Sequence, residues 1–222
     1  MKKITLATMG LCMLTITSCG TSQGNGALIG TGAGAALGAI VGKIAGNTAV
    51  GAAIGGAVGA GTGAIIGRHM DKVKAEAAAK VQNAKVEEVT DANGLKAVKL
   101  TFDSGLQFDL NKSTLRAAAK KDLINFASVL KHNTDCLVDI QGYTDATGGD
   151  KINVPLSQSR AQAVSSYLVS QGVSSSQFKN VAGYGSQNPI VDKTVAPKNR
   201  RVEVYLYASP EMVQKAENGT LK

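Results

Sequence analysis

Two runs of glycine at every fourth position constrain the N-terminal part of this chain more than any other feature. The first run comprises Gly30, Gly34, Gly38, Gly42 and Gly46, and the second comprises Gly51, Gly55, Gly59, Gly63 and Gly67. Positions i and i+4 of an α-helix lie on one face, so each run would form a stripe without side chains. Two helix backbones can approach closely along such stripes.

The spacing predicts a helical hairpin over residues 27–67, with helices at 27–46 and 49–67 joined by a turn at Asn47-Thr48. At about 1.5 Å per residue, each helix would be about 30 Å long, the hydrocarbon thickness of a bilayer. The segment resembles the glycine zippers of bacterial envelope proteins. We expect it to enter a membrane or to self-associate, and a compact hairpin outside the membrane is the alternative. An unstructured Ala/Gly spacer is disfavoured, because Leu, Ile and Val stand between the glycines.

Residues 1–18 are typical of a bacterial export signal, in which Lys2 and Lys3 precede a short apolar stretch. The sequence Ile16-Thr17-Ser18-Cys19 resembles a lipobox. This resemblance implies that Cys19 becomes the acylated N-terminus, which would attach the chain lastingly to membrane lipid. Residues 19–26 would then form a flexible tether. A plain secretory signal that happens to contain a cysteine is the alternative.

The cysteines and histidines are too few for a disulfide framework or an evident metal motif. Of the three cysteines, Cys12 leaves with the signal and Cys19 carries lipid, which leaves Cys136 without an intramolecular disulfide partner. Its alternating apolar surroundings predict a buried thiol in a strand. His69 and His132 lie near no cysteine or paired carboxylates in the sequence, so we expect no metal and no cofactor.

The formal net charge of +8 does not indicate a nucleic-acid-binding protein, because the basic residues are scattered and no basic run is interleaved with aromatics. A mild positive excess suits an anionic lipid surface or an anionic polymer.

Residues 68–85 are rich in strong helix formers, and Glu76 and Lys80 make a favourable i, i+4 pair. We interpret this segment as a solvated linker helix with no chemistry of its own. At the other end of the chain, residues 211–222 are interpreted as a polar tail.

Residues 86–210 have the patterns of a globular domain. The patterns predict a hairpin turning at Asn93-Gly94, helices at 113–130 and 156–170, and strands at 137–143, 178–184 and 201–207. Ser113 is the expected N-cap of the first helix, and Gly172 the expected end of the second. This order predicts an α+β fold with helices packed on one side of a small mixed β-sheet.

Four motifs follow one another in this region. They are Gly142-Tyr143-Thr144-Asp145-Ala146-Thr147-Gly148, the segment from Asn153 to Arg160-Ala161, Gly183-Tyr184-Gly185, and Asn199-Arg200-Arg201-Val202. In this order and spacing they resemble the OmpA-like family over residues 98–208. Tyr143 stands where that family commonly has histidine.

The resemblance implies that the domain binds the peptide stem of peptidoglycan. It assigns Asp145 to the ammonium of the stem's diamino acid and Arg160 to its carboxylate. The other residues that match pocket positions are Asn111, Thr144, Asn153, Asn199 and Arg200. The chemistry is sound, because a guanidinium fork matches a carboxylate and a zwitterion needs both charges nearby. The alternative is structural, with Asp145 and Arg160 paired as a loop clamp and with Asn199 and Arg200 capping a strand end.

Taken together, these resemblances imply an outer-membrane lipoprotein with a periplasmic C-terminal domain that tethers the membrane to the cell wall. No catalysis is expected, because no nucleophile–base pair is evident. Two alternatives are an envelope assembly protein that forms homo-oligomers through the glycine hairpin, and a wall hydrolase.

Overall fold

The computed structural model describes residues 58–103, 108–109 and 111–221. The predicted signal, Cys19, the tether and most of the glycine hairpin lie outside these residues. The helices are α2 (Ala60–Lys80), α4 (Ala117–His132), α5 (Asp150–Ser170) and α6 (Pro210–Glu217), with 3₁₀ turns at Ser175–Gln177 and Pro197–Asn199. The strands are β1 (Ala84–Thr90), β2 (Lys96–Asp103), β3 (Cys136–Tyr143), β4 (Phe178–Gly183) and β5 (Arg201–Ala208).

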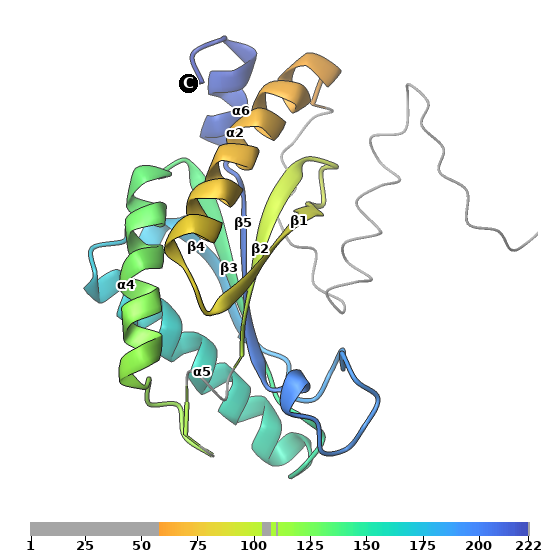
Figure 1. The fold of residues 1–222 in the computed structure, drawn as a ribbon. Helices are drawn as coiled ribbons and strands as arrows, with labels where there is room; N and C mark the ends of the chain where they lie inside the picture. The colour runs from red at the N-terminus through yellow and green to blue at the C-terminus, as the bar shows by residue number, and fades with distance from the viewer. Residues whose placement is uncertain (1–57, 104–107, 110, 222) are drawn as a thin grey trace, which may run out of the picture. The chain divides into compact units, whose positions relative to one another are not determined.

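The strands form one five-stranded sheet in the order β1-β2-β5-β3-β4. The first three pairings in this order are antiparallel, whereas β3 and β4 are parallel and are connected through α5. Helices α2, α4 and α5 lie against the same face of the sheet (Figure 1). The predicted α+β fold with helices on one side of a mixed sheet is therefore confirmed.

The core lies between this sheet face and the helices. Alternate residues of β5 point into it, with Val202, Val204 and Leu206 fully buried. Phe102 of β2 meets Phe126 of α4 edge to face, with ring centroids 6.1 Å apart. Alternate side chains of the strands and one face of each helix thus meet in one apolar layer.

Two predicted helix starts are wrong. Helix α4 begins after Arg116, which has no side-chain cap, so Ser113 is not its N-cap. Helix α5 begins at Asp150 and contains Pro155, whereas the sequence pattern predicts a start after the proline. Proline removes only the backbone N–H that would bond the carbonyl of Lys151, and the helix continues through it to Ser170.

The interpretation of residues 68–85 as a solvated linker helix is also wrong. Helix α2 starts before this segment and buries Ile66, Met70, Val73 and Ala77 in the main core. These residues are spaced by four, three and four positions and therefore form one face of the helix. Its other faces carry exposed charged and alanine residues, which explains why the segment resembles a solvated helix in sequence. Helix α2 is therefore part of the globular fold.

The C-terminal segment is likewise part of the fold, so its interpretation as a polar tail is wrong. Helix α6 is capped by Ser209, whose hydroxyl accepts a hydrogen bond from the amide of Met212 at 3.1 Å. Met212, Val213 and Ala216 are buried and join the same core. Three apolar residues on one face suffice to dock this short helix.

Across residues 58–221, leaving aside 104–107 and 110, no helix combines the length and apolar character needed to cross a bilayer.

Burial of α2 predicts that Ile66→Ala lowers the free energy of unfolding by about 2–5 kcal/mol, through lost burial and the cavity left behind. Lys72→Ala on the exposed side of the same helix should change it by less than about 0.5 kcal/mol. Urea unfolding of both variants measures the difference. Equal, small effects would contradict the packing of α2 in the core.

Candidate functional site

A cavity of about 270 Å³ lies at one end of α5, and we call it the Asp145 pocket. Its lining residues are Asn111, Thr144, Asp145, Thr147, Gly148, Ile152, Asn153, Leu156, Arg160 and Arg200. Six of the seven residues predicted for the binding site are therefore brought together. The seventh, Asn199, does not line the pocket.

Asp145 is the buried anion of this pocket, with its side chain 3% exposed. One carboxylate oxygen accepts hydrogen bonds from the amide and hydroxyl of Thr147, which forms a local turn. The other oxygen lies 3.4 Å from Nη1 of Arg200. Asp145 is therefore held in place by its own loop and pairs with Arg200, rather than clamping Arg160.

Arg160 is the buried cation on α5. Its Nε donates to the carbonyl of Lys112 at 3.1 Å, and its guanidinium lies over the ring of Phe108 at 5.2 Å. Within the described part of the chain, its two terminal nitrogens have no hydrogen-bond partner. Burial and the charge of Arg200 lower the pKa of Arg160, and Asp145 opposes this shift. An incoming carboxylate would find a guanidinium edge that is already oriented.

The first turns of α5 hold the pocket together. Nδ2 of Asn153 donates to the backbone carbonyl of Asp145 at 3.0 Å, which ties the loop to the helix. Asn153 and Arg160 are seven positions apart and share one helix face. No side chain caps the start of α5, which follows Gly149.

Two pocket residues have unusual local states. The hydroxyl oxygen of Thr144 is buried and has no hydrogen-bond partner within the described residues. Asn111 adopts a left-handed backbone conformation with φ of 54°, which asparagine tolerates better than most residues. An unpartnered buried hydroxyl that lines a cavity is a group that a polar ligand can satisfy.

Asn199 has a structural position. Its Oδ1 accepts from the amides of Ile190 and Val191 at 2.8 and 2.9 Å, and its Nδ2 donates to the carbonyl of Val191 at 2.8 Å. The side chain therefore fastens the loop before β5. Asn199 therefore has a structural role, but it fastens a loop rather than capping a strand end.

A buried ionic network in β5 supports the same loop. Nε of Arg201 donates to Oε1 of Glu203 at 2.7 Å, and Nη2 donates to the carbonyl of Asn188 at 3.0 Å. Lys99 of β2 reaches the same carboxylate at 2.8 Å. Burial raises the pKa of Glu203, but Arg201 and Lys99 outweigh it, so the pKa is lowered overall.

Several residues that complete the pocket are not predicted from the sequence. Thr147 orients Asp145, Ile152 and Leu156 provide apolar walls, and Phe108 supports Arg160. The Asp-x-Thr spacing is a signal for the first, since an aspartate side chain commonly accepts a hydrogen bond from the backbone amide two residues on. Phe108 approaches Arg160 only through the tertiary fold.

Residues 107–203 match the sequence model of the OmpA family, and residues 1–71 match that of the YMGG-like Gly-zipper. The chain therefore carries an OmpA-family domain together with an N-terminal Gly-zipper segment, as its motifs predict. Among relatives, it is 35% identical over 144 residues to the probable lipoprotein YiaD of Escherichia coli strain K12, covering 64% of each chain. It is 39% identical over 111 residues to the peptidoglycan-binding protein ArfA of Mycobacterium tuberculosis, covering 49% of this chain but 34% of that protein.

Solved structures share the fold. A MotB-like protein from Desulfovibrio vulgaris superposes with a TM-score of 0.55 at 19% identity, covering 66% of this chain and 99% of that one. The cell wall anchor of the T6SS from Pseudomonas aeruginosa superposes with a TM-score of 0.51 at 22% identity, covering 63% and 97%.

The position of Asn199 predicts that Asn199→Ala destabilises the protein by about 1–3 kcal/mol, because buried backbone groups lose their partners. Lys198→Ala, at the exposed neighbouring residue, should have little effect. Urea unfolding measures both. A variant at Asn199 as stable as the original chain would contradict its role in fastening the loop.

The lowered pKa of Glu203 predicts a pH-dependent contribution to stability. A carboxyl group whose pKa is lower in the folded than in the unfolded state stabilises the fold at pH values above its unfolded pKa. This contribution is lost as the pH falls through the folded pKa. The stability difference between the original chain and Glu203→Gln should therefore be large at neutral pH and shrink below about pH 4.5. Denaturation across pH measures it, with the exposed Glu217→Gln as the control. A stability difference between the original chain and Glu203→Gln that stays constant in acid would contradict the lowered pKa of Glu203.

Proposed function

We propose that the Asp145 pocket binds the peptide stem of peptidoglycan through the zwitterionic centre of its diamino acid. One observation carries the proposal. The pocket brings a buried carboxylate, Asp145, to the same cavity as a buried guanidinium, Arg160, whose terminal nitrogens are available.

The charges suggest how a ligand would be oriented. The ligand ammonium would lie against Asp145, in competition with the 3.4 Å contact from Arg200. The ligand carboxylate would accept from the terminal nitrogens of Arg160, and amides at the uncapped start of α5 would favour the same anion. The unpartnered hydroxyl of Thr144 adds a polar contact within the pocket.

The relatives support this assignment, since ArfA is named as a peptidoglycan-binding protein and matches 49% of this chain. The proposed function needs binding only. No step in it makes or breaks a covalent bond.

We further propose that the chain is a lipoprotein of the outer membrane, anchored through acylated Cys19, with the OmpA-family domain in the periplasm. The lipobox-like sequence before Cys19, the Gly-zipper match and the likeness to YiaD support this arrangement. The protein would then tether the outer membrane to the cell wall and support envelope integrity.

Co-sedimentation of the full-length protein with purified sacculi tests the pocket. Asp145→Asn and Arg160→Gln should each weaken binding by more than about tenfold, because charge-assisted hydrogen bonds contribute about 1.5–3 kcal/mol each. Free stem peptide should compete with sacculi. A stem peptide whose diamino-acid carboxylate is amidated should compete poorly, because it no longer pairs with Arg160.

The control variants Asp192→Asn and Lys198→Gln change similar charges on the exposed loop outside the pocket and should bind normally. Circular dichroism and thermal melting establish that the pocket variants fold. Folded pocket variants that pellet with sacculi as well as the original chain does would show that the site is elsewhere.

A further inference from the structure

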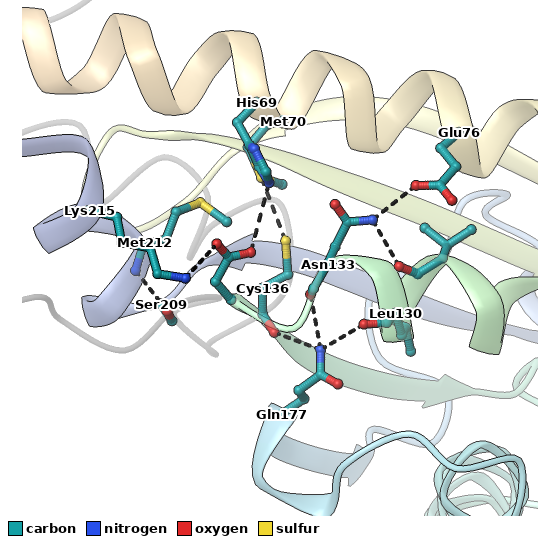
Figure 2. Close-up of polar contacts among 12 residues, drawn as sticks. His69, Met70, Glu76, Leu130, Asn133, Cys136, Gln177, Ser209, Met212 and Lys215 are labelled. Atoms are coloured by element: carbon teal, nitrogen blue, oxygen red, sulfur yellow. Dashed lines mark hydrogen bonds and ion pairs between the residues drawn. The ribbon is translucent and has the colours of Figure 1, made fainter. Parts of the chain in front are cut away.

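A second cluster of ligating side chains lies at the opposite end of β3 from the Asp145 pocket. His69 of α2 meets Asp135 and Cys136, which are at the start of β3, and we call these three residues the His69 cluster. Their ligand atoms all lie within 4.8 Å of one another. Figure 2 shows His69 and Met70 on α2 facing Cys136. The sequence pattern does not predict this cluster, because only the packing of α2 brings residue 69 close to residue 136.

The three side chains supply one imidazole nitrogen, one sulfur and one carboxylate oxygen. This mixed set is the donor chemistry of zinc, which binds such atoms at about 2.0–2.3 Å in tetrahedral geometry. Neighbouring donors in such a site are about 3.3–3.8 Å apart. Nε2 of His69 is already 3.8 Å from Oδ1 of Asp135, so small side-chain movements would complete the geometry.

A fourth donor lies beside the cluster. The sulfur of Met70 is 4.0 Å from Sγ of Cys136, close to the separation of two sulfurs on one metal ion. The hard carboxylate of Asp135 favours zinc over copper(I), whereas the thioether of Met70 favours copper(I), the softer ion. The three primary donors therefore select zinc, and Met70 lies where it can contribute without being required.

The cluster is accessible from solvent. A cavity of about 470 Å³ is lined by both His69 and Asp135, and by His132 and Lys215. The side chains of His69 and Asp135 are partly exposed, at 15% and 14%. An ion can therefore enter from the cavity, and a water molecule can occupy a remaining coordination position.

Two features of the cluster oppose binding and bear on its strength. Burial and the charge of Asp135 raise the pKa of the Cys136 thiol, so the metal must displace its proton. Nζ of Lys215 lies 3.4 Å from Oδ2 of Asp135, but its side chain is half exposed and can turn to solvent. Lys215 contacts Oδ2 of Asp135, whereas Oδ1, the other carboxylate oxygen, faces His69 and is the proposed metal ligand.

We propose that His69, Asp135 and Cys136 form a zinc site that fastens α2 to the start of β3. Zinc would add a coordinate link between the helix that leads into the domain and the central part of the sheet. This role is independent of wall binding, because the site uses none of the residues of the Asp145 pocket.

Metal titration of the full-length chain in detergent tests the proposal, in a background of Cys12→Ser and Cys19→Ser that leaves Cys136 as its single thiol. Cobalt(II) is the spectroscopic probe. One equivalent should give tetrahedral d–d bands and a thiolate charge-transfer band, both abolished by zinc. Saturating zinc should raise the melting temperature by about 5–10 °C.

His69→Gln, Asp135→Asn and Cys136→Ser should each weaken zinc binding by more than about tenfold, and Cys136→Ser should also remove the charge-transfer band. His132→Gln is the matched control, because this histidine lines the same cavity but is outside the donor set. Melting of each variant without metal establishes that it folds. The proposal is overturned if cobalt gives no thiolate band, or if folded His69 and Cys136 variants bind zinc as tightly as the control.

Discussion

Helix α5 lies against β3 and β4 at a separation that depends on two glycines. A β-carbon at Gly142 would collide with the backbone of Ser157, and one at Gly183 would collide with the backbone of Gln158. The close approach also permits direct bonds from helix to sheet. The amide of Gly183 donates to Oε1 of Gln158 at 2.7 Å, and the amide of Gly185 donates to Oγ of Ser157 at 2.9 Å. The glycines of the family motifs thus set the position of the helix that supplies four of the ten residues lining the pocket.

The Asp145 pocket depends on this contact because its charges come from separate segments. Asp145 follows β3, Arg160 lies on α5, and Arg200 precedes β5. Two cations lie near one anion, and because Arg200 pairs with Asp145, Arg160 is left without an anionic partner among the described residues of the pocket. The loop that carries Arg200 is fixed by the side chain of Asn199 and by Arg201, so few groups need to reorganise when a ligand enters.

The sequence predicts the sheet, the side on which the helices pack, and six residues of the pocket, because strand alternation and motif order are local patterns. Burial of α2 is less evident, since its core face includes Ala77 and is flanked by alanines and charges that suit a solvated helix equally well. The bonds of Asn199 to the backbone could not be predicted from residue type, because a buried asparagine suits a pocket and a loop clasp alike. The meeting of His69 with Cys136 is a tertiary contact between segments far apart in the chain, which no spacing rule can reveal.

The course of α2 has a mechanical consequence. The helix that receives the chain from its N-terminal segment is continuous from Ala60 to Lys80 and buries one face along much of its length. A pull applied at Ala60 along the helix axis would have to shear a whole row of core contacts together. Contacts loaded in parallel resist such a pull better than contacts that open one at a time. If the chain is a tether as proposed, a pull would thus enter the fold through a helix that is part of its core.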